Sequence, residues 1–249
     1  MDLFFNIIIF VLGLMVGSFL NCVIYRLEQE KRFFKGRSYC PDCKHQLRWP
    51  DLIPVLSFLS LRGRCRYCQK KISWQYPIVE ISTAAIFFLI FNFQLSIFNY
   101  LILPFLIVIF VYDLKYYLIP DKVIYPAIGM VLVYDFLKSD IPGMSDFLIS
   151  AFGAAAFFLF IVLISKGKWM GIGDIKLAFL MGLVLGWPNI LAALFLAFMS
   201  GAMIGIGLIF LGKKTLKSEV PFGPFLVAGT FISLFFGKII INWYSHFLW

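Results

Sequence analysis

Long apolar runs separated by short polar segments dominate the chain. The first run, residues 3–25, is close to the ~20 residues that a helix needs to cross the hydrocarbon of a bilayer. Similar runs recur to the end of the chain, which predicts an all-α polytopic membrane protein. We expect about eight membrane-spanning helices, at residues 3–25, 77–93, 97–112, 123–138, 146–165, 176–187, 189–211 and 221–246.

Two segments depart from this regular pattern. The run at 176–187 is short and contains glycine, so it is also compatible with a broken helix that lines a polar cavity. The segment 26–76 is the one long polar stretch, and it is too small for apolar burial alone to hold it folded. Another source of stability is therefore expected in that segment.

Composition and charge support a membrane protein and predict its orientation. Apolar residues make up 61% of the chain and charged residues 14%, which is more apolar surface than one soluble core can hide. The net charge of +9 is concentrated between the predicted helices, because 20 of the 22 Lys and Arg residues lie in four loops. With the N-terminus outside, all four loops face the cytoplasm, as the positive-inside rule requires. This topology explains the positive charge without a nucleic-acid partner.

Four of the five cysteines form two closely spaced pairs in the polar segment. The pairs are Cys40-Pro-Asp-Cys43 and Cys65-Arg-Tyr-Cys68, separated by 21 residues. Two such knuckles supply the four thiolates of a tetrahedral zinc site and predict a small zinc-ribbon-like loop. Two disulfides are the alternative, but stable disulfides are uncommon in the reducing cytoplasm. Because four thiolates leave no open position on the metal, we expect a structural zinc ion.

The few acidic residues of the chain are the candidates for catalysis. Asp113 ends the third predicted span, and Asp174 enters the sixth within Gly171-Ile-Gly173-Asp174. If the two carboxyl groups converge, one is expected to keep its proton while the ionised one activates a water molecule for hydrolysis. The alternative is that each Asp is a simple helix cap or interfacial charge, which is the commoner role of a lone Asp.

Four further residues are candidates for supporting roles. Gly171 and Gly173 lack a Cβ and so permit a sharp turn or close approach of a peptide. Asp121 is expected at a helix start, where the dipole favours it. Glu80 lies inside the second predicted span, where an ionisable group is costly and is expected to line a polar pocket. A transporter or assembly subunit, with Asp113, Asp174 and Glu80 along an ion path, is an alternative function.

Taken together, the motifs resemble those of the bacterial prepilin peptidases, or type IV leader peptidases, along nearly the whole chain. The resemblance rests on their order and intervals. It is carried by Gly17-Ser-Phe-Leu-Asn-Cys-Val-Ile-Tyr-Arg26, the two cysteine knuckles around Trp49-Pro-Asp-Leu-Ile-Pro54, Tyr76-Pro-Ile-Val-Glu80, Asp113 with Ile119-Pro-Asp121, Gly171-Ile-Gly-Asp-Ile-Lys176 and Val220-Pro-Phe-Gly-Pro224.

The resemblance implies a membrane aspartyl protease that uses Asp113 and Asp174. Its expected substrates are precursors of type IV pilins or type II secretion pseudopilins, cut at the cytoplasmic face of the inner membrane. It also implies methylation of the new N-terminus with S-adenosylmethionine, for which no contact residues are assigned, and it leaves the oligomeric state open. We expect three parts: a first membrane helix at 1–25, a cytoplasmic zinc-binding loop at 26–76 and a membrane peptidase domain at 77–249.

Overall fold

The computed structural model describes residues 2–30, 36–138, 141–212 and 220–248, and these residues are mostly helical. Helices are expected of apolar runs in lipid, because only internal hydrogen bonds can satisfy the backbone there. The described residues contain two isolated β-bridges and no strand. The elements are α1 (Asp2–Glu28), η1 (Trp49–Leu52), α2 (Leu56–Ser60), α3 (Gln75–Asn92), α4 (Ile97–Tyr116), α5 (Asp121–Lys138), α6 (Ile141–Ser165), α7 (Ile172–Leu185), α8 (Asn189–Phe210) and α9 (Gly223–Leu248).

The prediction of an all-helical, multi-pass membrane protein is confirmed, although the count of eight spans is not. Within the described residues, six helices are long and apolar enough to cross a bilayer: α1, α3, α4, α6, α8 and α9. The remaining predicted spans correspond to α5 and α7. The 18 residues of α5 include two Asp and two Lys residues, and α7 has only 14 residues. At 1.5 Å per residue α7 extends about 21 Å, less than the ~30 Å of hydrocarbon.

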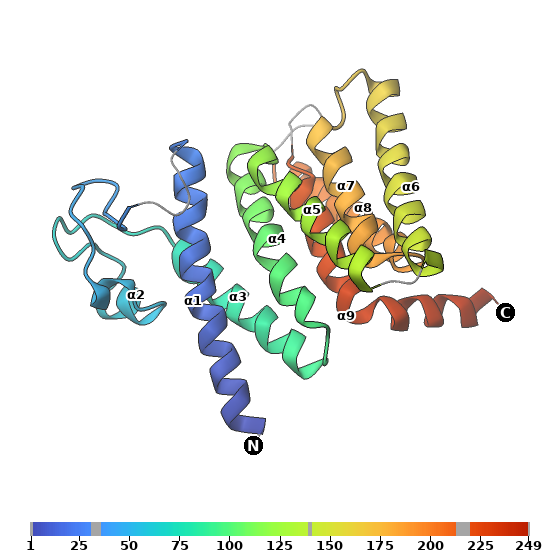
Figure 1. The fold of residues 1–249 in the computed structure, drawn as a ribbon. Helices are drawn as coiled ribbons and strands as arrows, with labels where there is room; N and C mark the ends of the chain where they lie inside the picture. Colours follow the sequence, from blue (N-terminus) through green and yellow to red (C-terminus); the bar gives the residue numbers. More distant parts are fainter. Residues whose placement is uncertain (1, 31–35, 139–140, 213–219, 249) are drawn as a thin grey trace. The chain divides into compact units, whose positions relative to one another are not determined.

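The chain divides into two compact units, residues 1–108 and 109–249, with the division inside α4. In the N-terminal unit α1 packs along α3, as Figure 1 shows. A Cβ at Gly13 would lie 2.5 Å from the Cα of Ala84, and one at Gly17 would lie 2.6 Å from the Cα of Glu80. Small residues four apart therefore let the two backbones approach closely, as is common between membrane helices. The predicted three-part division at residues 25 and 76 stays a prediction.

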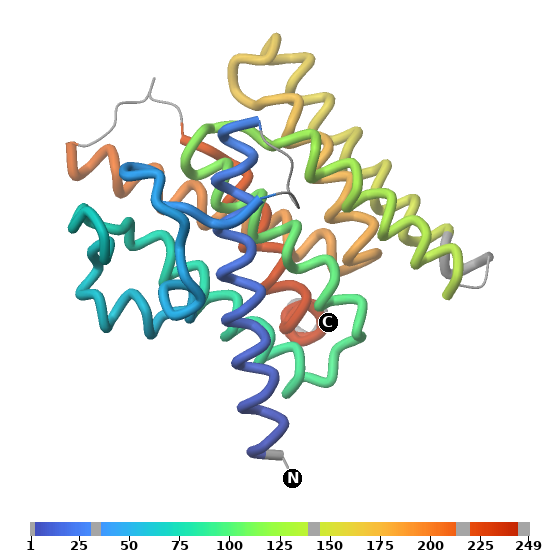
Figure 2. Tube along the Cα trace, turned by 60° about the vertical axis from the view of Figure 1, so that its left-hand side comes forward, coloured from blue at the N-terminus to red at the C-terminus, as the bar shows by residue number. Residues whose placement is uncertain are grey.

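In the C-terminal unit, α7 is the central helix. It packs against α5, α6, α8 and α9, and α6 runs beside it in both views (Figures 1 and 2). Leu177, Leu180 and Met181 are fully buried along it. Because protein surrounds α7, it does not need the length of a lipid-facing span. It is one continuous short helix over its described residues, and not the broken helix considered from the sequence.

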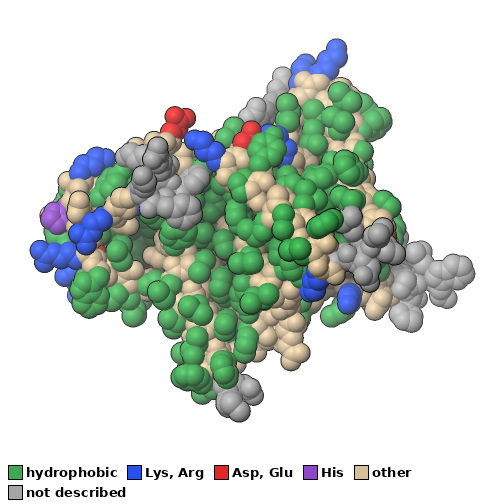
Figure 3. All heavy atoms as spheres, viewed as in Figure 1, with side chains coloured by type: hydrophobic (Ala, Val, Ile, Leu, Met, Phe, Trp, Pro, Cys, Tyr) green, Lys and Arg blue, Asp and Glu red, His purple; other side chains and the backbone are tan. Residues whose placement is uncertain are grey.

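Apolar side chains also cover much of the outer surface. Figure 3 shows hydrophobic side chains over most of the visible face of both units. On α6 and α8, large residues such as Leu163 and Phe195 are more than 60% exposed. A soluble protein rarely exposes so much contiguous apolar area, whereas lipid contact accounts for it.

Candidate active site and metal centre

The four cysteines of the two knuckles lie together in the N-terminal unit. Their sulfur atoms all lie within 4.8 Å of one another, and those of Cys40 and Cys68 are 3.9 Å apart. In a tetrahedral site with Zn–S bonds of about 2.3 Å, neighbouring sulfurs are separated by about 3.8 Å. Cys40 and Cys65 are buried and none of the four forms a disulfide. The cluster therefore has the donor atoms and spacing to hold a metal ion, and four thiolates would complete its coordination.

The two knuckles share the same local geometry. In the first, the backbone N–H of Lys44 donates to the carbonyl of Cys40 at 3.0 Å, and in the second Gln69 donates to Cys65 at the same distance. Lys44 and Gln69 both adopt positive φ, at 59° and 61°. Each turn thus brings its two cysteines back onto one side, where backbone N–H groups donate to the sulfur atoms. Burial by itself would raise the pKa of Cys65, but hydrogen bonds from the backbone N–H groups of Cys68 and Tyr67 and from the neighbouring thiols lower it to about 7. At Cys40 burial prevails and the pKa is raised.

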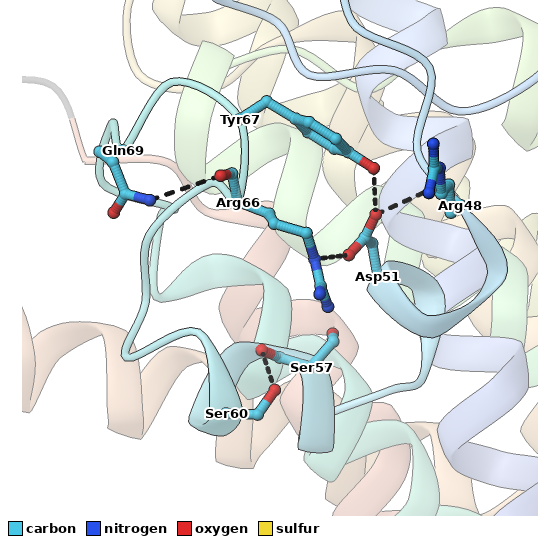
Figure 4. Close-up of polar contacts among 7 residues, drawn as sticks. All are labelled: Arg48, Asp51, Ser57, Ser60, Arg66, Tyr67 and Gln69. Carbon is cyan, nitrogen blue, oxygen red and sulfur yellow. Dashed lines mark hydrogen bonds and ion pairs between the residues drawn. The ribbon is translucent and has the colours of Figure 1, made fainter.

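Asp51 fastens the segment between the knuckles to the second knuckle. Its carboxylate accepts hydrogen bonds from Arg66 Nε at 2.7 Å, the Tyr67 hydroxyl at 3.0 Å and the backbone N–H of Arg48 at 3.2 Å (Figure 4). Its side chain is only 4% exposed. Burial alone would raise the pKa of Asp51, but these three donors outweigh burial and lower it. The carboxylate is therefore a structural anion that connects η1 to the metal centre.

Asp113 lies in the last turns of α4, and the N-terminus of α9 lies against it. The side chain is 5% exposed, and the backbone N–H of Gly223, the first residue of α9, donates a hydrogen bond to its carboxylate. A Cβ at position 223 would lie 2.5 Å from Asp113 Oδ2. Only glycine lets the start of α9 approach this closely, so its amide can orient the carboxylate.

Asp174 occupies the first turn of α7. It is 9% exposed, and its Oδ2 accepts the N–H of Gly171, the N-cap residue, at 3.1 Å. Gly171 has an ordinary φ of −83°, whereas at Gly173 a Cβ would lie 3.1 Å from that of Ile119. Of the two glycines, Gly173 is the one that permits close approach, and the approaching group is the loop before α5.

The two predicted catalytic carboxylates lie within range of each other's charge. Asp113 lies close enough to Asp174 for their charges to interact, although the two residues come from different helices. Each also accepts a backbone N–H from a helix N-terminus, where the dipole favours negative charge. One negative charge shared by the pair is therefore stabilised, while two would repel.

The supporting carboxylates take other positions. Asp121, the first residue of α5, is exposed and its Oδ1 lies 2.6 Å from Lys176 Nζ, so it ties α5 to α7 just beyond the site. Glu80 belongs to the N-terminal unit. It is buried, and its Oε2 accepts the N–H of Val55 at 2.8 Å while the hydroxyl of Ser18 also bonds to it. The carboxylate of Glu80 is thus hydrogen-bonded to other residues of the protein.

Two features of the C-terminal unit were not recognised from the sequence. The sequence does not show that Gly223 contacts Asp113. The only signal in Val220-Pro-Phe-Gly-Pro224 is a glycine near the start of a predicted helix. Asp135 of α5 is 6% exposed, and within the described residues its buried Oδ2 has no hydrogen-bond partner. An acidic residue inside the predicted span 123–138 was the available signal for that position.

Comparison with known proteins agrees with the architecture. Residues 11–93 match the family described as "Bacterial Peptidase A24 N-terminal domain", and residues 100–206 match the "Type IV leader peptidase family". No solved structure matches the chain significantly.

Several curated relatives match over nearly their whole lengths. A protein of Bacillus subtilis (strain 168) is 32% identical, with 95% of this chain and 96% of the relative covered. Proteins of Aeromonas salmonicida (strain A449) and Aeromonas hydrophila are 33% and 34% identical, each with 97% of this chain and 94% of the relative covered. All three are named "Prepilin leader peptidase/N-methyltransferase". With its paired aspartates, its cysteine knuckles and this extent of similarity, the chain belongs to the type IV leader peptidase family.

Proposed function

We propose that this protein is a membrane aspartyl peptidase that removes the leader from type IV prepilins or pseudopilins and methylates the new N-terminus. The observation that carries the peptidase is the pairing of Asp113 and Asp174, both buried and each oriented by a backbone amide. The names of the relatives support prepilins as substrates and a second, N-methyltransferase activity. Both observations favour peptidase chemistry over the transporter or assembly alternative.

Peptide hydrolysis by the pair needs one proton shared between two carboxyl groups. The ionised Asp removes a proton from a water molecule, whose oxygen attacks the carbonyl carbon of the scissile bond. The protonated Asp gives its proton to the carbonyl oxygen, which forms a neutral tetrahedral diol. Collapse of the diol breaks the C–N bond: the Asp that took the proton from water gives it to the departing amine, and a diol hydroxyl gives its proton to the other Asp, so the pair is again singly protonated. The amides of Gly223 and Gly171 hold the two side chains in place throughout.

We assign the metal of the cysteine cluster as zinc with a structural role. The four sulfur atoms fit the tetrahedral spacing of zinc and leave no position for water or substrate. Bound there, zinc would crosslink two short turns in a segment with little apolar core. S-adenosylmethionine is the proposed methyl donor, and no residue of the described chain is assigned to it.

The proposed topology places the chemistry on the cytoplasmic side of the inner membrane. The segment that carries the four cysteines and the polar turns beside Asp113 and Asp174 hold most of the Lys and Arg residues. With the N-terminus outside, a prepilin could keep its apolar helix in lipid while its leader reaches the aspartates. In this arrangement residues 1–25, 26–76 and 77–249 act as anchor, zinc loop and peptidase domain.

The test is to incubate the purified protein in detergent with a prepilin that carries its leader and to measure the masses of substrate and products. Wild type should release the leader, and adding S-adenosylmethionine should increase the product mass by one methyl group. Asp113→Ala and Asp174→Ala should leave the prepilin intact. Asp146→Asn, which changes an exposed carboxylate on α6, is the matched control and should cleave normally.

Each possible failure points to a different part of the proposal. An active Asp113→Ala or Asp174→Ala variant would remove that residue from the catalytic role. Cleavage without methylation would leave a peptidase alone. No cleavage of several prepilins by folded wild-type protein would overturn the proposed function.

A further inference from the structure

Exposed apolar side chains gather in the segment between the two cysteine knuckles and at Trp74, which follows the second knuckle. We define this inter-knuckle face as Trp49, Leu52, Ile53, Leu56, Leu59 and Trp74. Leu56 and Leu59 are 64% and 61% exposed, and Trp49 and Trp74 are 78% and 67% exposed. A soluble loop would be expected to bury or replace such residues.

Local geometry places four of these side chains in two pairs, each pair on one side of its short helix. Leu56 and Leu59 are three residues apart on α2 and so project from one side, while Phe58 points inward and its ring centroid lies 4.9 Å from that of Trp74. In η1, Trp49 and Leu52 are also three apart, which superposes them on one side of a 3-10 helix. The intervening Asp51 turns instead to the second knuckle (Figure 4).

The inter-knuckle face is fastened beside the membrane-capable helices α1 and α3. Val55 immediately precedes α2, and its N–H donates to Glu80 inside the membrane-capable helix α3. Glu80 in turn bonds to Ser18 of α1. Ser18 lies about 10 Å along α1 from Tyr25, the end of its apolar run, at 1.5 Å per residue. Figure 1 accordingly shows α2 beside the middle of α1 and not beyond its end.

The charges around the inter-knuckle face fit a lipid surface. The exposed Arg48 and Arg62 flank the segment that carries α2, and residues 26–76 hold 12 Lys and Arg against 4 Asp and Glu. Arginine can place its alkyl part along apolar surface while its head reaches a phosphate. Tryptophan is enriched at the membrane interface, and the cytoplasmic leaflet is anionic.

We propose that the inter-knuckle face is a membrane-contact surface, with α2 and η1 inserted among lipids and the flanking arginines at the phosphates. The zinc loop would then be a membrane-bound element and not a free cytoplasmic domain. This inference does not depend on the proposed catalysis, because it uses only contacts within the N-terminal unit.

The test is photochemical labelling of the intact protein in nanodiscs of phosphatidylethanolamine and phosphatidylglycerol that contain a lipid with a diazirine in its acyl chain. After irradiation and trypsin digestion, mass spectrometry compares residues 49–62 with residues 38–44 of the first knuckle. Both segments end at natural Lys or Arg cleavage sites. We expect several-fold more lipid adduct per residue on 49–62.

A pair of variants assigns the labelling to named side chains. Leu56→Ser combined with Leu59→Ser should reduce the adducts on 49–62 several-fold, whereas Leu163→Ser, an equally exposed leucine on α6, should leave them unchanged. Retained zinc would show that the double variant keeps its loop. If the double variant loses its zinc, the comparison of the two segments in the wild-type protein still tests the inference.

Three results would overturn the inference. The first is equal labelling of the two segments in wild type. The second is loss of the lipid adducts on 49–62 when prepilin is added, accompanied by crosslinking of prepilin to the same residues. That result would make the face a substrate site. The third is loss of the adducts when two copies instead of one occupy each nanodisc, which would make it a contact between copies.

Discussion

The cysteine cluster and the aspartate pair are assembled in opposite ways. Each cysteine knuckle is a closed turn in which a few consecutive residues fix two thiols. The spacing of each cysteine pair in the sequence therefore already determines two of the four candidate ligands. Asp113 and Asp174 come from helices separated by α5 and α6 in the chain, and the amide that orients Asp113 comes from a third helix. The cysteine cluster depends on local turns, whereas the aspartate pair depends on helix packing.

The largest expected effect tests whether the aspartates act as one unit. Asp113→Asn and Asp174→Asn should each reduce prepilin cleavage by roughly 10²–10⁴-fold, because each removes one partner of the proton exchange. The double variant should be no worse than either single one, since residues that work together are not additive. Initial rates of leader release measure this effect. If the loss of rate in the double variant equalled the product of the two single losses, the carboxylates would be acting independently.

The next effect separates the two sites. Cys65→Ser should release the metal, because three thiolates hold zinc much less tightly than four, and it should harm methylation more than cleavage. Metal content by mass spectrometry and the two activities measure this outcome. Cys22→Ser, which changes a cysteine of α1 outside the cluster, should retain the metal. Equal metal in both variants would refute the metal site.

A smaller effect is expected where α9 meets Asp113. Gly223→Ala should lower the cleavage rate by about tenfold or more, because the added Cβ displaces the carboxylate, and small misplacements are costly in catalysis. Gly129→Ala is the matched control. A Cβ at Gly129 meets nothing within 4 Å, and the change improves helix propensity in α5. Equal rates in the two variants would remove Gly223 from the positioning of the site.

The smallest effect concerns the link between η1 and the second knuckle. Asp51→Asn should weaken the metal-bound loop by about 1 kcal/mol, since it removes the charge from hydrogen bonds to Arg66 and Tyr67. Chelator titration of bound metal measures the change. Asp42→Asn breaks a more exposed pair with Lys70 and should have almost no effect.

This last prediction has a defined pH dependence. The folded-state pKa of Asp51 is lowered below its ordinary value of 3.8, so its stabilising contribution is present above that value and is lost as pH falls through the lowered pKa. The difference between wild type and Asp51→Asn should therefore be constant from about pH 6 to pH 8. If the difference between the two proteins changed within this range, another titrating group would have to be coupled to the hydrogen bonds of Asp51.

The sequence predicted the membrane class and most of the helices because lipid imposes a length and an apolar composition on each span. The predicted 97–112 and 189–211, for example, lie close to α4 and α8. The same criterion failed to distinguish α7, whose apolar residues face other helices and not lipid. The short helices η1 and α2 were not anticipated, since a single turn leaves no periodic pattern.

What the sequence alone determined is the chemistry that is local: the thiol pairs, the apolar spans, the concentration of basic residues in the loops and the identity of the scarce carboxylates. Only the tertiary structure decided that Asp113 and Asp174 lie within range of each other's charge and that Gly223 touches Asp113. It also decided that Glu80 accepts the N–H of Val55, within the N-terminal unit. The physical reason is that consecutive residues constrain one another through the backbone. The neighbours of a membrane helix are instead chosen by side-chain packing across segments far apart in the chain.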